Sequence, residues 1–250
     1  MTTTALLAAQ AAIHASIQAR AIELGYDRAK VEPIYDGVVD AAGYLAAKPK
    51  VLWILKEPYD DFDEDGNPQG GGWTMFKDPA PGKTLAQSVN ANAALRNVAY
   101  ASAAILNGVD SYSKLPWIAD KPLMYETALR RVAYCNVGKM PGRTTTSTAR
   151  LQKIVGEWKD ILFRQIDLYA PDVIIVCGTD TLQALAGDMG LELAKPARTV
   201  KRDGAVVDVH EWRGRRLLWA PHPAARIPPG EWVDAVVEAA SASAGQTGCD

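Results

Sequence analysis

Four short apolar runs recur along the chain, and longer stretches with apolar residues at helical spacing separate them. The runs are VLWIL (51–55), RVAYCN (131–136), VIIVCG (173–178) and RLLWA (216–220). Between the second and third runs, apolar side chains from Leu151 to Ile166 recur every three or four positions, which is the period of an amphipathic helix. Short strands that alternate with helices are typical of a parallel sheet covered by helices. The pattern predicts an α/β fold, a three-layer sandwich around a central, mainly parallel four-stranded sheet.

The remaining segments predict the other helices and the domain limits. Helical patterns occupy residues 4–24, 84–107, 179–189 and 231–242. The segment 61–73 is too polar and too rich in glycine for a helix or a strand, and it predicts a mobile loop. We expect a helical extension over residues 1–48 that packs on a single domain over residues 49–240. The small polar residues 241–250 predict a disordered tail.

The composition limits the class of protein. With 250 residues, 48% of them hydrophobic, the chain is long enough for one sizeable core. The net charge of -2 argues against a surface that is basic throughout, so any site for a polyanion must be local. The three cysteines are far apart and lack CxxC spacing, which argues against a disulfide framework or a cysteine-rich metal site. The apolar N-terminus is interrupted by polar residues, unlike a signal peptide or membrane span. We expect a cytoplasmic, monomeric protein without membrane contact, metal or organic cofactor.

Polar residues follow each of the four apolar runs. Ligands of open α/β sheets sit beyond the carboxyl ends of the strands, so these positions are the candidates for a site. They are KEPY (56–59), NVGKMPGRTTTS (136–147), GTDT (178–181) and PHPAAR (221–226). A carboxylate, an amide, a helix N-terminus and a histidine held between two prolines are therefore expected to meet at one edge of the sheet.

These motifs, taken in order, resemble those of a known family. LKEPY resembles the first motif of the uracil-DNA glycosylase superfamily, Gly-Gln-Asp-Pro-Tyr or Gly-Glu-Ala-Pro-Gly, and HPAAR resembles the second, His-Pro-Ser followed by a loop with an arginine. The middle of the chain, CNVGKMPGRTTTS and then ILFRQIDLYAPDVIIVCGTDTLQAL, is similar to the iron-sulfur branch of that family. The resemblance covers roughly residues 50–235 and implies the family's fold, with its central sheet between helices.

The sequence departs from the family's pattern at both motifs. Leu55 stands where the first motif has glycine, Glu57 where many members have aspartate or alanine, and Ala224 where the second motif has serine. Met140 falls near a cluster cysteine of the iron-sulfur branch, and no cysteine precedes residue 135. Because such clusters need four thiolates, we expect a divergent member without the cluster.

The resemblance implies a monofunctional DNA glycosylase that hydrolyses the N-glycosidic bond of uracil or a related deaminated base. Breaking this bond builds positive charge on the sugar and negative charge on the departing base. Glu57 is the candidate for orienting water and stabilising the oxocarbenium-like sugar, and His222 for donating a hydrogen bond to the base oxygen. Asn136 carries a donor and an acceptor on one flat group, which matches O4 and N3–H of uracil.

The expected partner is single- or double-stranded DNA with the target base flipped into the pocket. Trp73 or Phe76 is the candidate for stacking on that base, and Tyr59 for a guard against the thymine methyl group. Arg226 and Ile227 are candidates for a wedge that fills the gap in the duplex. The expected phosphate contacts come from Lys139, Arg143, Ser147 and the amides that open the helix at Thr179.

Each of these residues also has a purely structural interpretation. His222 can hydrogen-bond a turn, Glu57 can join a surface ion pair, and Asn136 can turn the chain after a strand. The aromatic side chains can serve packing, and the lysine and arginines can be solvated charges. The stretch RGRR (213–216) is typical of a basic hairpin turn.

Two other functions stay open at this point. A non-catalytic nucleic-acid-binding member of the same fold is favoured by Leu55 and Ala224. A hydrolase of free nucleosides or nucleotides is favoured by the mild acidity of the chain and by its lack of a long basic stripe.

Overall fold

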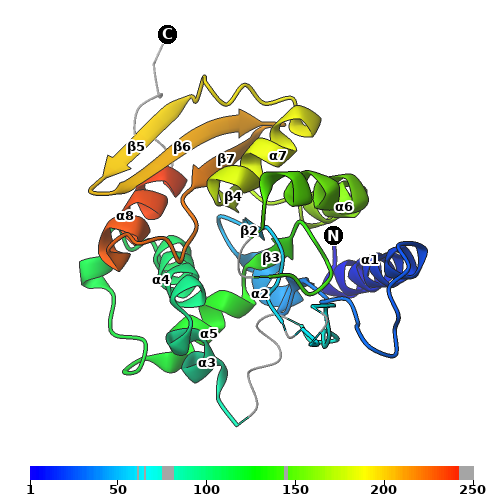
Figure 1. Ribbon diagram of the computed structural model, residues 1–250. Helices are drawn as coiled ribbons and strands as arrows, with labels where there is room; N and C mark the ends of the chain where they lie inside the picture. Colours follow the sequence, from blue (N-terminus) through cyan, green and yellow to red (C-terminus); the bar gives the residue numbers. More distant parts are fainter. Residues whose placement is uncertain (61, 65, 75–81, 144–145, 242–250) are drawn as a thin grey trace.

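The computed structural model describes residues 1–60, 62–64, 66–74, 82–143 and 146–241. Within them the chain forms one seven-stranded sheet of order β1-β3-β2-β4-β7-β6-β5 (Figure 1). The strands are β1 (Gly37–Val38), β2 (Val51–Leu55), β3 (Ala133–Asn136), β4 (Val173–Cys177), β5 (Arg198–Arg202), β6 (Ala205–Trp212) and β7 (Arg215–Ala220).

The four predicted runs form the four adjacent parallel strands β3, β2, β4 and β7. The sheet continues beyond them, because β1 pairs antiparallel with β3, and β6 and β5 add antiparallel strands beside β7. The α/β class is confirmed. The predicted four-stranded, mainly parallel sheet is wrong, since the sheet is mixed and has seven strands.

The outer strands differ from the inner ones in burial. Every residue of β2 and β4 is buried, which gives continuous apolar runs, whereas buried and more exposed residues alternate along most of β6. The β6–β7 connection is the hairpin turn predicted for RGRR. Arg213 and Gly214 at its tip have φ values of 49° and 70°, as a tight hairpin turn with two left-handed residues requires.

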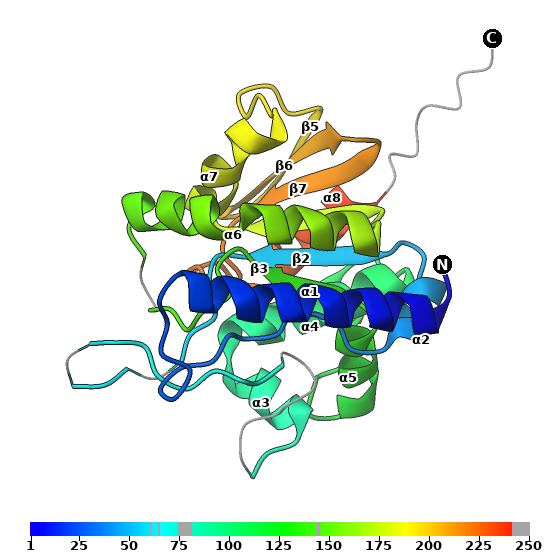
Figure 2. The ribbon, with the colours of Figure 1, turned by 90° about the vertical axis from the view of Figure 1, so that its right-hand side faces the viewer.

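Helices cover both faces of the sheet and make three layers, which confirms this part of the prediction. The helices are α1 (Thr3–Glu23), α2 (Ala41–Ala46), α3 (Leu85–Ala91), α4 (Ala93–Asn107), α5 (Pro122–Arg130), α6 (Thr148–Tyr169), α7 (Thr179–Met189) and α8 (Pro229–Ala240), with a 3-10 turn over Tyr112–Lys114. Helices α3, α4, α5 and α8 pack on one face, and α1, α2, α6 and α7 on the other; Figure 2 shows α1 and α6 lying side by side. No helix in the described part of the chain is long and apolar enough to cross a membrane.

The core has two halves, one on each side of the sheet. Alternate residues of β2 belong to opposite halves: Trp53 faces α4 and α8, and Ile54 faces α6. The Trp53 indole stacks on that of Trp232 at 6.1 Å between ring centroids, and it donates a hydrogen bond to the hydroxyl of Ser102. Burying an aromatic side chain of this size contributes roughly 3 kcal/mol or more, so this contact fixes α8 on the sheet.

The N-terminal segment is joined to the sheet by buried polar contacts. Gln10 of α1 donates to the carbonyl of Val38 (3.0 Å) and accepts from its amide (2.8 Å), which fixes β1 against α1. Two residues before Val38, Asp36 is 1% exposed and accepts from the amide of Asn136 (2.6 Å). The first 48 residues therefore help to hold the end of β3 in place.

The glycine-rich segment contacts the N-terminal part of the chain through its backbone. Gly70 and Thr74 form parallel bridges with Val31 and Tyr35. Gly71 has a φ of 83° and lies against the carbonyl of Glu32, where a Cβ atom would overlap the oxygen. Residues 66–74 form neither a helix nor a strand, as expected, and backbone bridges hold parts of them against residues 31–35. Residues 242–250 of the expected tail lie outside the described residues.

Candidate active site

A cavity of about 390 Å³ lies beyond the carboxyl ends of β2, β4 and β7. Its position agrees with the rule that ligands of open α/β sheets bind at this edge. Six of its ten lining residues have polar side chains, and the lining comes from four separate segments. The lining residues are Lys56, Thr146, Leu151, Gly178, Thr179, Asp180, Thr181, Pro221, His222 and Ala225.

His222 is held in one orientation by the turn that contains it. The amide of Ala224 donates to Nδ1 of the ring (3.1 Å), and the amide of Ala225 donates to the carbonyl of His222 (2.8 Å). Because Nδ1 accepts, the neutral ring carries its proton on Nε2. Burial, together with the positive charge of Lys56, lowers the pKa of His222 below its ordinary value, which favours this neutral form.

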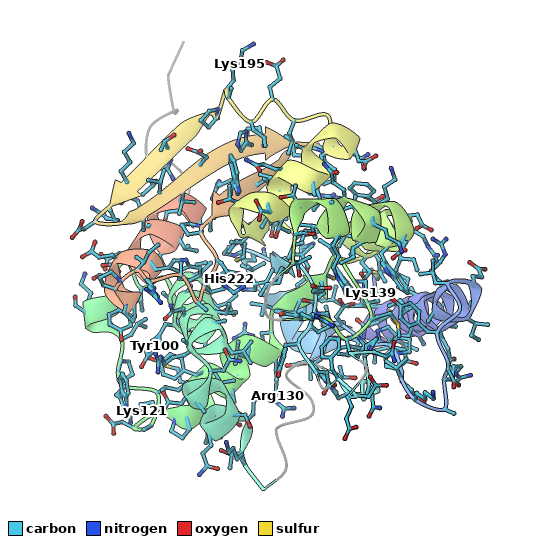
Figure 3. All side chains as sticks on the ribbon, viewed as in Figure 1. Tyr100, Lys121, Arg130, Lys139, Lys195 and His222 are labelled. Carbon is cyan, nitrogen blue, oxygen red and sulfur yellow. The ribbon has the colours of Figure 1, made fainter. Side chains whose placement is uncertain are left out.

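The two prolines beside His222 anchor its turn to the helices on one face of the sheet. The buried amide of Asn97 in α4 donates to the carbonyl of Pro223 (2.8 Å). The indole of Trp232 in α8 donates to the carbonyl of Pro221 (3.1 Å). The histidine is thus fixed from both sides, which is the rigidity that PHPAAR suggests. Figure 3 shows His222 near the centre of the view.

Lys56 lines the same cavity, one residue beyond β2. Its side chain is half-buried, and its Nζ donates to the hydroxyl of Thr146 (3.2 Å). Burial lowers the pKa of Lys56, against the opposing charges of Glu57 and Asp180. The cavity therefore contains an amine, a neutral imidazole and, on Asp180, a carboxylate.

Glu57 does not reach this cavity. Its side chain is only 2% exposed, and the carboxylate accepts from the hydroxyl of Thr146 and lies 3.6 Å from Arg150. The carboxylate lies against Gly142, where a Cβ atom would overlap it, and lines a separate cavity of only about 20 Å³. Glu57 and His222, expected to act in one pocket, therefore do not line the same cavity. Glu57 is connected to the His222 cavity through Thr146, which also accepts a hydrogen bond from Lys56.

Asn136 ends β3 and is 1% exposed. Its Oδ1 lies 3.5 Å from the hydroxyl of Tyr134, and its Nδ2 is buried without a hydrogen-bond partner among the described residues. Buried amide donors are rarely left unpaired, so this nitrogen is a feature that a structural role alone does not explain. The side chain does not line the His222 cavity.

Lys139 is a structural residue, and its expected phosphate contact is wrong. The side chain is fully buried, and Figure 3 places it well apart from His222, toward α1. Its Nζ donates to Asp36 (2.8 Å), to the carbonyl of Asn136 (2.5 Å) and to Gln165 (2.7 Å). These acceptors use all three protons of the ammonium.

The other expected phosphate ligands are spread over the surface. Arg143 is exposed, donates to the carbonyl of Gly66 (3.1 Å) and lies over the ring of Phe62. Ser147 is exposed and caps α6, because its hydroxyl accepts from the amide of Arg150 (3.3 Å). Among the four expected ligands, Thr179 alone lines the cavity, at the first turn of α7.

The expected base-stacking residues are not gathered at the cavity. Tyr59 is 61% exposed and pairs with Gly142 through a backbone bridge. Trp73 donates its indole N–H to Asp60 (2.7 Å). Neither ring lines the cavity. Phe76 lies outside the described residues.

The two expected wedge residues differ from each other. Arg226 is exposed on the loop that follows His222. Ile227 is partly buried and packs against the core beside α8, near Gly204 of the β5–β6 turn. A wedge role therefore suits Arg226 better than Ile227.

Sequence reasoning missed Lys56, Asp180 and Thr146, although each belongs to a segment that the strand-end rule selects. Each of the three lies within one to three residues of a strand or helix terminus, and this position could have identified them. Within the described residues, no cluster of three or more His, Cys, Asp or Glu side chains is suited to hold a metal ion.

A scan against protein-family models finds no match, and a search of curated proteins finds none either.

Proposed function

We propose that the chain is a divergent member of the uracil-DNA glycosylase superfamily and hydrolyses the N-glycosidic bond of uracil or a related deaminated base in DNA. The observation that carries the proposal is His222, a neutral ring with a fixed Nε2–H at the edge where four parallel strands end. A fixed neutral donor suits a leaving base, because negative charge builds on the base oxygen as the bond breaks.

The carboxylate that acts with His222 is Asp180. It lines the same cavity, whereas Glu57 is buried behind Thr146. In this mechanism Asp180 orients the attacking water and offsets the positive charge that develops on the sugar. Glu57 has the supporting role of holding Thr146, which in turn accepts a hydrogen bond from Lys56.

The unpaired amide nitrogen of Asn136 supports base recognition on the neighbouring strand. The amide can donate to the base from Nδ2 and accept from Oδ1. A flipped base that reaches the end of β3 would supply the missing hydrogen-bond partner of Nδ2. The target base must leave the duplex to reach any such pocket.

A second candidate, hydrolysis of free nucleosides or nucleotides, is favoured by one observation. Two of the expected phosphate ligands already have protein partners, because Lys139 is fully buried and Arg143 is bonded to the backbone of Gly66. A DNA enzyme loses affinity steeply as salt rises, while an enzyme on a single nucleoside responds little.

The test is strand cleavage after alkali on labelled oligonucleotides that carry uracil, hypoxanthine or xanthine, beside the matching free nucleosides. We expect cleavage of one lesion, a 10²–10⁴-fold loss in His222→Ala, and a larger loss in Asp180→Asn than in Glu57→Gln. Activity that His222→Ala leaves unchanged contradicts the mechanism. Salt-sensitive binding without cleavage of any lesion identifies a non-catalytic DNA-binding protein instead.

A further inference from the structure

Lys56 is the amine of the candidate active site, and the proposed hydrolysis does not use it. It lines the cavity with His222 and Asp180. Under the proposed function, this cavity receives the sugar whose base has been removed. The side chain is half-buried and directed by the hydroxyl of Thr146. Lysines in such desolvated settings act as nucleophiles toward carbonyl groups.

An anion-binding role suits Lys56 poorly. Both Asp180, inside the cavity, and Glu57, behind Thr146, act electrostatically on this lysine. These negative charges repel a phosphate dianion bound beside Lys56. A neutral carbonyl compound meets no such repulsion, so the surroundings favour covalent chemistry over phosphate binding.

We propose that Lys56 forms an imine with the aldehyde of an abasic sugar and gives the protein a β-elimination activity on abasic DNA. This inference rests on the proposed function, since base removal generates the abasic sugar. It replaces the expected monofunctional glycosylase by a bifunctional one.

The step balances without an oxidant or a reductant. The neutral amine of Lys56 attacks C1′ of the ring-opened sugar, and loss of one water gives the imine. Asp180 takes a proton from C2′, and the electron pair of that C–H bond forms the C2′–C3′ double bond while the C3′–O3′ bond breaks. The 3′-oxygen leaves with the phosphate of the downstream strand. Water then hydrolyses the imine and returns the amine and an unsaturated aldehyde.

Among the described residues, three charged groups act on Lys56: Glu57 and Asp180 oppose the loss of its proton, and Arg150 favours it. His222 lies in the same cavity. Burial has the largest effect and lowers the pKa of the amine, which raises the fraction of neutral nucleophile at neutral pH.

The test uses the full chain with single-stranded and duplex oligonucleotides that contain a preformed abasic site. Sodium borohydride reduces the imine to a stable secondary amine, which is measured as a protein–DNA adduct and located by peptide mass spectrometry. A tetrahydrofuran abasic analogue, which has no aldehyde, is the substrate control. Cleavage without alkali is measured in parallel.

We expect the parent to give an adduct on Lys56 and to cleave the abasic strand. Lys56→Ala and Lys56→Arg are expected to lose both activities at least 10-fold, and the arginine variant retains the charge if the alanine variant fails to fold. Lys153→Ala, which changes an exposed lysine of α6, is expected to equal the parent.

Three results overturn the inference: no adduct with the parent, an adduct undiminished in both Lys56 variants, or an adduct located on the N-terminal amine or another lysine. Removal of uracil without any adduct refutes the role of Lys56 and leaves the proposed glycosylase standing. An adduct on abasic DNA without removal of any base refutes the glycosylase and leaves the role of Lys56 standing.

Discussion

Lys139 and Lys56 follow neighbouring parallel strands, yet they are built into the molecule in opposite ways. Lys139 lies three residues beyond β3 and is fully buried, with three acceptors around its ammonium. Lys56 lies one residue beyond β2 and is half-buried on the wall of a cavity. The Lys139 ammonium is enclosed by its own chain and stabilises the fold, whereas the Lys56 ammonium borders open volume.

The groups around each lysine reinforce this difference. Asp36 and Gln165 bond to Lys139 and to each other, so the buried network satisfies its own members. Asp180 lines the cavity on the exposed first turn of α7. The surroundings of Lys139 are a buried hydrogen-bond network, whereas those of Lys56 resemble a binding site.

The largest expected effect is on stability, when each lysine is replaced by methionine. Lys139→Met leaves the buried carboxylate of Asp36 without its ion pair, and such losses cost about 3–5 kcal/mol. Lys56→Met is expected to cost less than about 1 kcal/mol, since its head group borders the cavity. Urea unfolding of both variants measures the difference, and equal losses contradict the distinction between the two regions.

The sequence predicts the inner strands better than the outer ones for a physical reason. Residues of β2 and β4 are buried on both faces and give unbroken apolar runs. The β5–β6 hairpin is half-exposed, and β1 has only two residues, so neither gives such a run. The four parallel strands were therefore predictable, and the mixed edges were not.

The candidate site was predictable in place but not in its residues. The strand-end rule selects His222, which does line the cavity. It cannot separate Lys56 from Glu57, because the path of the chain after β2 decides which one faces the cavity. It also misassigns Lys139, whose partner Asp36 lies 103 residues away along the chain. Side-chain direction and distant partners are properties of the folded chain.

The second prediction concerns the strap of residues 70–74, which pairs with the segment that leads to Asp36. Gly71→Ala places a Cβ atom on the carbonyl oxygen of Glu32 at a φ of 83°. Gly25 has the same φ with open space around it, so Gly25→Ala pays only the cost of the left-handed backbone, about 1 kcal/mol. We expect Gly71→Ala to lose about 2 kcal/mol more than this control in thermal or urea unfolding. Equal losses of unfolding free energy in Gly71→Ala and Gly25→Ala would mean that the strap shifts to accommodate the added methyl group without a further loss of stability.

The third prediction concerns the anchor of the His222 turn. Asn97→Ala removes the buried donor to the carbonyl of Pro223, which is expected to cost about 1–2 kcal/mol. Asn107 makes a bond of the same kind, to the carbonyl of Ala103 at the exposed end of the same helix. Asn107→Ala is therefore the matched control, with a loss of about 0.5 kcal/mol or less. An equal loss from both would show that the turn does not depend on α4.

The smallest effect is a change in the pKa of His222, and it tests whether Lys56 and His222 share one cavity. Burial and Lys56 lower the pKa of His222 in the folded chain below 6.5, its ordinary value. Below pH 6.5 the unfolded chain then binds more protons at this residue than the folded chain, so its contribution to stability declines as the pH falls. Lys56→Met removes the positive charge and is expected to raise the pKa of His222 back toward 6.5, as measured by NMR titration of the ring. Lys153→Met, on the exposed surface of α6, is expected to leave it unchanged. A pKa that stays the same or falls in Lys56→Met would place the amine too far from the imidazole to act on the same substrate.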